Sequence, residues 1–349
     1  MKKNIYDLSL EQLTSEMVML GQKPYRAKQL FSWLYVKRVD SFAAMTDVAA
    51  AFRAVLAEKY EILLPKVYKQ QVSSDGTMKL LLELSDGHKV ETVLMPYNYG
   101  DAVCVTSEVG CNMGCAFCAS GLLKKKRGLT AGEMVGQVLT VDWLLREIDP
   151  DRHVTHVVVM GTGEPFDNYD NVIRFIRTVN SQFGLSIGAR HITVSTCGVV
   201  PGILRYGAEG LQVNLAISLH APTDEIRNTL MPINKVYPLS RLIEAVIRYG
   251  EDSGGRRVTY EYILLSGIND SDENASQLAD LVAPTFGYVN LIPYNEVDEN
   301  GFKRSSNNRI HRFQDILLQR GIKATIRKEF GSDIDAACGQ LRARYEKRD

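Results

Sequence analysis

The sequence has no long hydrophobic run. Its longest apolar segments, such as residues 157–160, are far shorter than the roughly 20 residues that cross a bilayer. The residues that follow Met1 are mostly polar and contain no apolar stretch of the kind that marks a secretory signal. We therefore expect a soluble, cytoplasmic protein without membrane association.

The sequence also has no net charge, because 41 Lys and Arg residues balance 41 Asp and Glu residues. A nucleic-acid binder is often basic overall, so here any such contact must come from local basic patches.

Cysteine is scarce, and its distribution is uneven. The chain of 349 residues has six cysteines, and Cys111, Cys115 and Cys118 lie within eight residues of one another. A structural disulfide framework is not expected in a reducing cytosol. Clustered cysteines in an intracellular chain indicate a metal or iron–sulfur site instead. The isolated cysteines, Cys104, Cys197 and Cys338, would each be typical of an inert buried side chain if taken alone.

The pattern of apolar residues divides the chain into three parts. Residues 1–65 have the 3–4 residue spacing of helices, which predicts an N-terminal helical accessory domain. Residues 66–100 contain three strand-like runs separated by Asp75-Gly76 and Asp86-Gly87, which predict a small antiparallel β element with hairpin turns. Residues 101–349 alternate strand and helix patterns, which indicates an α/β core with a parallel sheet or barrel.

Within the third part, helix starts and strands are marked locally. Thr130-x-x-Glu133 has the form of a capping box, and Asp270-x-x-Glu273 resembles a second helix start. Six or seven strand–helix units are too few for a complete eight-fold barrel. We expect strands at residues 102–106, 154–160, 191–195, 213–219, 258–265, 288–292 and 324–327.

The three clustered cysteines follow the first expected strand of this core with the spacing C-x3-C-x2-C. Thiolates are the usual ligands of iron–sulfur clusters, and three of them leave one iron of a four-iron cluster open. The loop resembles that of the radical SAM superfamily, whose partial (β/α)6 barrel places it after the first strand. The resemblance implies a [4Fe-4S] cluster on Cys111, Cys115 and Cys118. Its open iron would bind S-adenosylmethionine (SAM) and generate a 5′-deoxyadenosyl radical.

A structural zinc site is the alternative for this loop, with Cys104 as a fourth ligand. Zinc sites usually combine two separated pairs of Cys or His, which this spacing does not provide. Protein purified without oxygen would be brown with an iron–sulfur cluster and colourless with zinc.

Small polar residues end several of the expected strands. In barrels the carboxyl ends of the strands carry the active site. Gly163 and Glu164 lie in a Gly-Thr-Gly-Glu-Pro segment, which looks like the superfamily's motif for the SAM amino group, although a short glycine motif alone is weak. Ser195, Ser218 and Asn295 end further strands. We expect a nucleoside pocket formed by Gly163, Glu164, Ser195, Ser218, Leu219, His220 and Asn295.

Longer motifs make the resemblance more specific. Glu91-Thr-Val, Cys104-Val-Thr-Ser, Ser218-Leu-His-Ala-Pro, Leu230-Met-Pro-Ile-Asn and the segment around Cys338 are similar to those of the RlmN/Cfr family of RNA methyltransferases. The family scheme implies that Cys338 carries the methyl group, that Glu91 is the general base, and that Cys104 forms a disulfide with Cys338. Without the resemblance, Glu91 would be an ordinary solvated strand residue.

The resemblance also implies substrates and partners. We expect methylation of adenine C2 in 23S rRNA and of the adenine beside the tRNA anticodon, with a flavodoxin-like electron donor and a monomeric enzyme. The alternatives are C8 methylation of the same rRNA adenine, a radical SAM enzyme for peptides or small molecules, and a zinc-stabilised RNA-binding module without turnover. The basic run 124–127 beside the cysteine loop is a candidate phosphate contact, although such runs are usually solvated faces.

Overall fold

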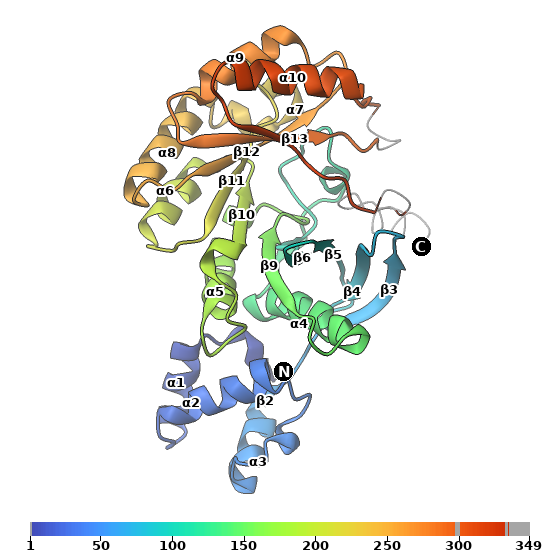
Figure 1. The fold of residues 1–349 in the computed structure, drawn as a ribbon. Coiled ribbons are helices and arrows are strands. Elements are labelled where there is room, and N and C mark those ends of the chain that lie inside the picture. The colour runs from blue at the N-terminus through green and yellow to red at the C-terminus, as the bar shows by residue number, and fades with distance from the viewer. Residues whose placement is uncertain (1, 297–300, 332–333, 335–349) are drawn as a thin grey trace.

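The computed structural model describes residues 2–296, 301–331 and 334. The first part of the chain is a helical lobe, drawn in blue in Figure 1. Its parallel pair β1–β2 joins the start of the chain to the end of α3. In chain order the lobe contains β1 (Lys3–Asn4), η1 (Ile5–Asp7), α1 (Leu10–Met19), α2 (Tyr25–Phe31), η2 (Ser32–Val36), η3 (Phe42–Ala44), α3 (Ala50–Lys59) and β2 (Tyr60–Glu61).

The rest of the chain is built on one ten-stranded mixed sheet, which runs in the order β14-β13-β12-β11-β10-β9-β6-β5-β4-β3. The strands from β6 to β14 in this order are parallel, and β3 to β6 are antiparallel. The expected antiparallel element is thus continuous with the parallel sheet. The strands are β3 (Lys66–Val72), β4 (Met78–Glu83), β5 (Lys89–Tyr97), β6 (Gly100–Cys104), β9 (Val154–Val159), β10 (Ile192–Thr196), β11 (Asn214–Ser218), β12 (Val258–Leu264), β13 (Gly287–Pro293) and β14 (Ala324–Ile326).

Among the described residues, six crossovers connect seven parallel strands, which confirms the expected partial α/β barrel. Figure 1 shows the curved sheet with the crossover helices on its outer side. The Thr130–Glu133 capping box is present at the start of the first helix. The second expected start is wrong by one residue, because Ser271 and Asn274 form the capping box of α9. The helices are α4 (Ala131–Ile148), α5 (Tyr169–Asn180), α6 (Val200–Ala208), α7 (Asp224–Leu230), α8 (Leu239–Asp252), α9 (Asp272–Val282) and α10 (Asn307–Gln319).

The antiparallel strands have two buried faces of different character. Leu80, Leu82 and Leu94 belong to the main hydrophobic core. Because side chains alternate along a strand, Lys79 and Glu91 lie on the opposite face, toward the inside of the barrel. Both charged side chains are nevertheless buried. The inner face of these antiparallel strands, called the antiparallel wall below, therefore has buried charged side chains, in contrast to the apolar outer face.

The helical lobe and the barrel share one core. Ile5 and Tyr6 belong to the same buried cluster as the barrel strands. The Gly132 amide at the start of α4 donates to Asp7 Oδ1 at 3.0 Å. In the part of the chain that the structure describes, no helix has the length and apolar character to span a bilayer.

Candidate functional site

A cavity of about 330 Å³ opens at the carboxyl ends of the parallel strands. The predicted site residues that line it come from the cysteine loop and from the tips of four strands. Residues of the antiparallel wall and of the segment after β14 complete the lining, among them Val93, Met95 and residues 327–330. The predicted residues in the lining are Cys111, Cys115, Cys118, Gly163, Glu164, Ser195, Ser218, His220 and Asn295.

The cysteine loop follows β7 (Glu108–Val109) and is held by main-chain hydrogen bonds at its first cysteine and just after its second. The Cys111 amide donates to the Leu123 carbonyl at 2.8 Å, and the Ala116 amide donates to the Leu230 carbonyl at 2.9 Å. Gly110 has a φ of 78°, and a Cβ there would collide with the Lys124 carbonyl oxygen. The loop is therefore folded tightly enough that only glycine fits before Cys111.

The three thiols are half-buried and face one cavity. Burial raises the pKa of the Cys111 thiol to about 12, and it raises the pKa of Cys115 as well. Iron cations offset this cost, because they take the place of the protons on the sulfurs. No three His, Cys, Asp or Glu side chains of the described residues converge as they would around one metal ion. Three thiols spread around a cavity fit a four-iron cluster in which three of the irons would each take one thiolate.

Glu164 lies beside the cysteine loop and is held in one orientation. Its Oε2 accepts a hydrogen bond from the Cys197 amide at 2.8 Å, and its Oε1 accepts one from the Phe166 amide at 3.0 Å. Burial raises the pKa of this carboxyl above its usual value. The preceding Gly163 has a φ of 111°, and a Cβ there would meet Glu108 Cγ at 2.6 Å. Close packing against Glu108 thus restricts the main chain at Gly163, while the two amides fix the direction of the Glu164 carboxylate.

The serines at the tips of β10 and β11 lie next to each other, with Ser195 Oγ 3.2 Å from Ser218 Oγ. Leu219 does not line the cavity, because its side chain is buried in the main core. Its amide donates to the Glu261 carbonyl at 3.0 Å, and its own carbonyl accepts from Arg227 Nε at 3.0 Å. The structure therefore brings Ser195 and Ser218 together and directs Leu219 away from them.

His220 is buried and has a φ of 58°, which is unusual for a residue other than glycine. Its Nδ1 accepts a hydrogen bond from the Ile263 amide at 3.1 Å, so that nitrogen carries no proton. Burial, together with the Arg227 charge, lowers the pKa of His220 to about 3. The ring is therefore neutral near pH 7 and carries its proton on Nε2, which makes it a hydrogen-bond donor in the cavity wall.

Glu91 and Cys104 belong to the antiparallel wall behind this cavity. Cys104 lies opposite Val93 on the neighbouring strand, and it packs with Val93 and Met95, which line the cavity. Glu91 is on the same face, two residues before Val93, and its Oε1 lies 3.5 Å from Lys79 Nζ. Neither Glu91 nor Cys104 is among the cavity-lining residues. Both are buried side chains directly beneath the lining.

Cys338 lies outside the described residues. The chain that leads to it is described as far as Gly331, whose amide donates to Asp75 Oδ2 at 3.0 Å. Phe330 lines the cavity, stacks edge-on against Tyr97 and packs against the group that contains Cys104. The described segment that ends at Gly331 therefore passes along the antiparallel wall.

The basic run beside the cysteine loop is used mainly for internal contacts. Lys125 Nζ lies 2.7 Å from Glu108 and 2.6 Å from Asp167. Lys124 and Lys126 are exposed. Acidic residues engage Lys125 and Arg127, whereas Lys124 and Lys126 have no ion pair among the described residues. Two cations of the run thus connect the loop to the barrel, and the two exposed lysines are the ones still placed to contact phosphate.

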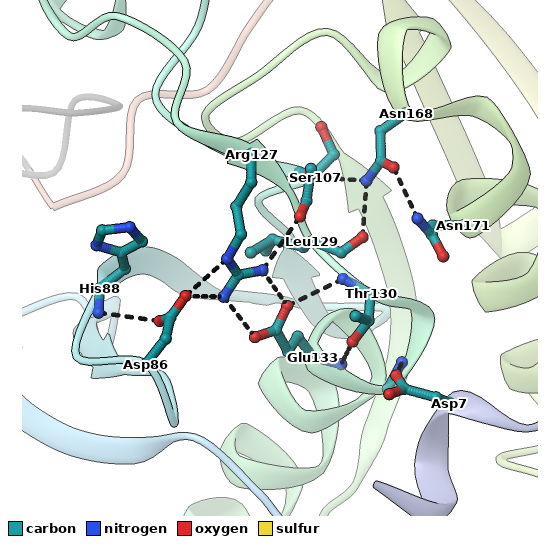
Figure 2. Close-up of polar contacts among 12 residues, drawn as sticks. Asp7, Asp86, His88, Ser107, Arg127, Leu129, Thr130, Glu133, Asn168 and Asn171 are labelled. Atoms are coloured by element: carbon teal, nitrogen blue, oxygen red, sulfur yellow. Dashed lines mark hydrogen bonds and ion pairs between the residues drawn. The ribbon is translucent and has the colours of Figure 1, made fainter. Parts of the chain in front are cut away.

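Arg127 is the second internal contact of this run, and Figure 2 shows its surroundings. Its guanidinium bonds both carboxylate oxygens of Glu133 at 2.7 and 2.8 Å and Asp86 at 2.7 Å. Nearby, Asn168 Nδ2 donates to the Ser107 and Leu129 carbonyls at 2.9 and 2.8 Å. The turn between β4 and β5, the start of α4 and the segment leaving the cysteine loop therefore meet at one arginine.

Two charged residues near the cavity were not found from the sequence. Lys79 is a lysine inside an otherwise apolar strand, which is a signal that could have been noticed. Arg227 is completely buried on α7, where its position in a short polar helix gave no such signal.

The partial barrel with its three-cysteine loop defines a radical SAM protein. Residues 106–279 match the model of the Radical SAM superfamily, and residues 3–62 match the ribosomal RNA large subunit methyltransferase N-terminal domain. A radical SAM methyltransferase structure from Sphaerobacter thermophilus has a TM-score of 0.92 and 46% identity, and the match covers 98% of this chain and 99% of that one.

Curated relatives are similar over nearly the whole length. The probable dual-specificity RNA methyltransferase RlmN of Geobacillus thermodenitrificans is 53% identical, over 99% of this chain and 94% of the relative. The protein of the same name from Enterococcus faecalis is 52% identical, over 100% and 98%. The chain therefore belongs to the RlmN family of the radical SAM superfamily. This membership implies a [4Fe-4S] cluster and SAM, and the three thiols at the cavity fit that pair.

Proposed function

We propose that this chain transfers a methyl group to C2 of an adenine in 23S rRNA and of the adenine beside the tRNA anticodon. Full-length similarity to relatives named as dual-specificity RNA methyltransferases supports an RNA substrate. The observation that carries the proposal is the packing of Phe330 against the group that contains Cys104. Cys338 follows Phe330 by eight residues, which is a span of at most about 3.6 Å per residue. The two thiols that the reaction requires are thus within reach of one cavity wall.

The cofactor end of the cavity has a set of proposed roles. Cys111, Cys115 and Cys118 hold the cluster, and Gly163 with Glu164 receives the SAM amino group. Ser195, Ser218, His220 and Asn295 bind the nucleoside part of SAM by hydrogen bonds. Leu219 has both of its main-chain groups already bonded, so we assign it to fixing the directions of Ser218 and His220.

Adenine C2 is not nucleophilic, so it cannot take a methyl group by simple displacement. A thiolate can, because it is a strong nucleophile. When bound, the cluster and SAM supply one-electron chemistry that removes a hydrogen atom from a methyl group. Cys338 takes that methyl group from one SAM as a thioether, and the carbon left after hydrogen removal forms the link to adenine. Glu91 then accepts the proton from the substituted carbon, and the unpaired electron of the adduct would return to the cluster. Cys104 attacks the Cys338 sulfur, the released carbon takes up a proton to complete the methyl group, and a disulfide remains for external thiols to reduce.

The remaining assignments belong to the same proposal. Residues 1–65 form an accessory domain that contacts RNA, residues 66–100 supply the wall with Glu91, and residues 101–349 form the radical SAM core. The enzyme works in the cytoplasm as a monomer and receives electrons from a flavodoxin-like protein. The matched domain named for a ribosomal RNA methyltransferase supports the first of these roles.

Methyl mapping tests the proposal. Reconstituted enzyme is incubated without oxygen with SAM, a reductant and either 23S rRNA or tRNA, and the nucleosides are separated by mass spectrometry. We expect 2-methyladenosine from both RNAs, and none with the Cys338→Ala variant. The appearance of 8-methyladenosine, or methylation that survives Cys338→Ala, would overturn it.

A further inference from the structure

Arg227 is a buried cation whose hydrogen-bond partners are all neutral. Its side chain is 0% exposed. Nε donates to the Leu219 carbonyl at 3.0 Å, Nη1 donates to Asn234 Oδ1 at 2.9 Å, and Nη2 donates to the Cys197 carbonyl at 2.7 Å. These bonds connect α7 to the ends of β10 and β11. They orient the guanidinium, but they do not neutralise its charge.

The nearest acid on the same helix is used elsewhere. Asp224 Oδ1 accepts hydrogen bonds from Asn234 Nδ2 at 2.8 Å and from the Leu239 amide at 2.9 Å. Across the residues that the structure describes, Arg227 has no salt bridge. A buried charge without a counter-charge is costly. Burial accordingly lowers the pKa of Arg227. The Asp224 charge acts on Arg227 without forming a salt bridge, so a further anion close to this buried cation would be stabilised.

The cysteine loop lies against the same helix. The Leu230 carbonyl at the end of α7 accepts the Ala116 amide from the loop. Cys115 packs against a buried group that includes Cys197 and Leu230. Arg227 Nη2 donates to the carbonyl of Cys197, and the Cys197 side chain packs in the same group as Cys115. Arg227 therefore lies against the ends of β10 and β11, which line the cavity together with Cys115, and is not itself among the lining residues.

We propose that Arg227 supplies the counter-charge of the iron–sulfur cluster and thereby raises its reduction potential. Three thiolates outweigh the positive charge of the iron–sulfide core, so the loaded site is anionic, and it gains a further negative charge on reduction. A fixed cation favours the reduced form, since net charge and hydrogen bonds near a cluster set its potential. Arg227 is thus a positioning and tuning residue, which acts through the cluster and does not touch the RNA.

A pair of substitutions separates charge from hydrogen bonding. Arg227→Lys keeps the charge and loses the planar fork of donors, whereas Arg227→Met loses both. The potential is measured by redox titration of the reconstituted protein, followed by electron paramagnetic resonance. We expect a lower potential for Arg227→Met than for wild type, and a potential near wild type for Arg227→Lys. Equal shifts in both variants, or no shift in either, would show that the charge does not act on the cluster.

Thermal unfolding gives a second readout. Because each variant is compared with its own cluster-free form, a loss of stability that both forms share does not affect the result. The difference in Tm between cluster-loaded and cluster-free protein is compared among wild type, Arg227→Lys and Arg227→Met. We expect the difference to shrink only in Arg227→Met. If neither variant retains a cluster, Arg227 is purely structural and the inference is wrong. The inference uses the cluster of the proposed function, but neither readout needs RNA, so failure to methylate RNA and failure of this charge role are distinguishable.

Discussion

The two sides of the cavity are built differently. On the side of the parallel strands, the proposed ligands stand on loops at strand tips and are fixed by main-chain hydrogen bonds, as in the Cys111 loop and at Glu164. On the antiparallel side, Glu91 and Cys104 stand in the middle or at the end of strands, buried beneath the lining and fixed by side-chain packing. In the proposed scheme, cofactor binding uses the tips of the barrel strands, as in other barrels, while methyl transfer uses residues of an added antiparallel wall.

Substitution of a cluster ligand should have the largest effect, because both sides of the cavity depend on the cluster. Cys115→Ala removes one of three iron ligands, and we expect loss of bound iron and of all RNA methylation. The effect should exceed the roughly 10–100-fold that is usual when an outer partner of a ligand is lost. Iron and sulfide content, with methyl transfer, are the measurements. Cys197→Ala serves as the control, and a full cluster in Cys115→Ala would contradict the assignment.

Glu91→Gln should separate the two sides. We expect a loss of about 10²–10⁴-fold in turnover, the usual contribution of a general base, with cluster content unchanged. The blocked step follows the link between Cys338 and RNA, so a covalent protein–RNA species should accumulate and be visible on a denaturing gel. Glu83→Gln on β4 is the matched control. Normal turnover in Glu91→Gln, or loss of its cluster, would remove the proposed division of roles.

Lys79→Met tests the wall alone. Removing one member of a buried ion pair leaves the other charge uncompensated, so we expect a loss of about 3–5 kcal/mol in the free energy of unfolding. The double variant Lys79→Met/Glu91→Met should recover most of that loss, because no charge is then left buried. Urea unfolding of the two variants and of wild type measures the effect. A double variant less stable than Lys79→Met would show that the stability loss in Lys79→Met does not come from an uncompensated Glu91 charge.

His220 predicts a smaller, pH-dependent effect on the cofactor side. Its pKa falls from an ordinary value near 6.5 to about 3 on folding, so the unfolded chain binds the proton more strongly. Protonation of His220 in the unfolded chain does not affect the free energy of unfolding above pH 6.5. As the pH falls from 6.5 toward 3, this protonation lowers the free energy of unfolding by up to about 1.4 kcal/mol per pH unit. Urea unfolding between pH 7 and pH 5 measures it. His220→Asn should have a shallower pH dependence, and an unchanged slope would contradict the neutral buried imidazole.

Much of the fold could be predicted from the sequence, because its signals are local. Each parallel strand is a short apolar run between helical segments, and the Asp-Gly pairs mark the hairpins of the antiparallel strands. The start of α9 could not be placed as well. Asp270 looks like a helix cap, but it bonds the Gly267 amide and Ser305 Oγ, which brings in a segment 35 residues away. A tertiary partner of this kind leaves no local pattern.

The candidate site divides in the same way. The residues at strand tips were predictable because each motif lies at the end of a strand, where the fold gathers such ends. Leu219 shows the limit, since a motif does not reveal which of its side chains turns into the core. Arg227 shows another limit, because the burial of its charge depends on elements that are distant in sequence.

The most direct test of the account is whether Cys104 and Cys338 join during turnover. The reaction is quenched by alkylation after a single round, and peptides are mapped without reduction. The account predicts a peptide pair linked through Cys104 and Cys338 that appears only when SAM, reductant and RNA are all present. A link between Cys338 and the cavity-lining Cys197, or no link despite methylated RNA, would contradict it.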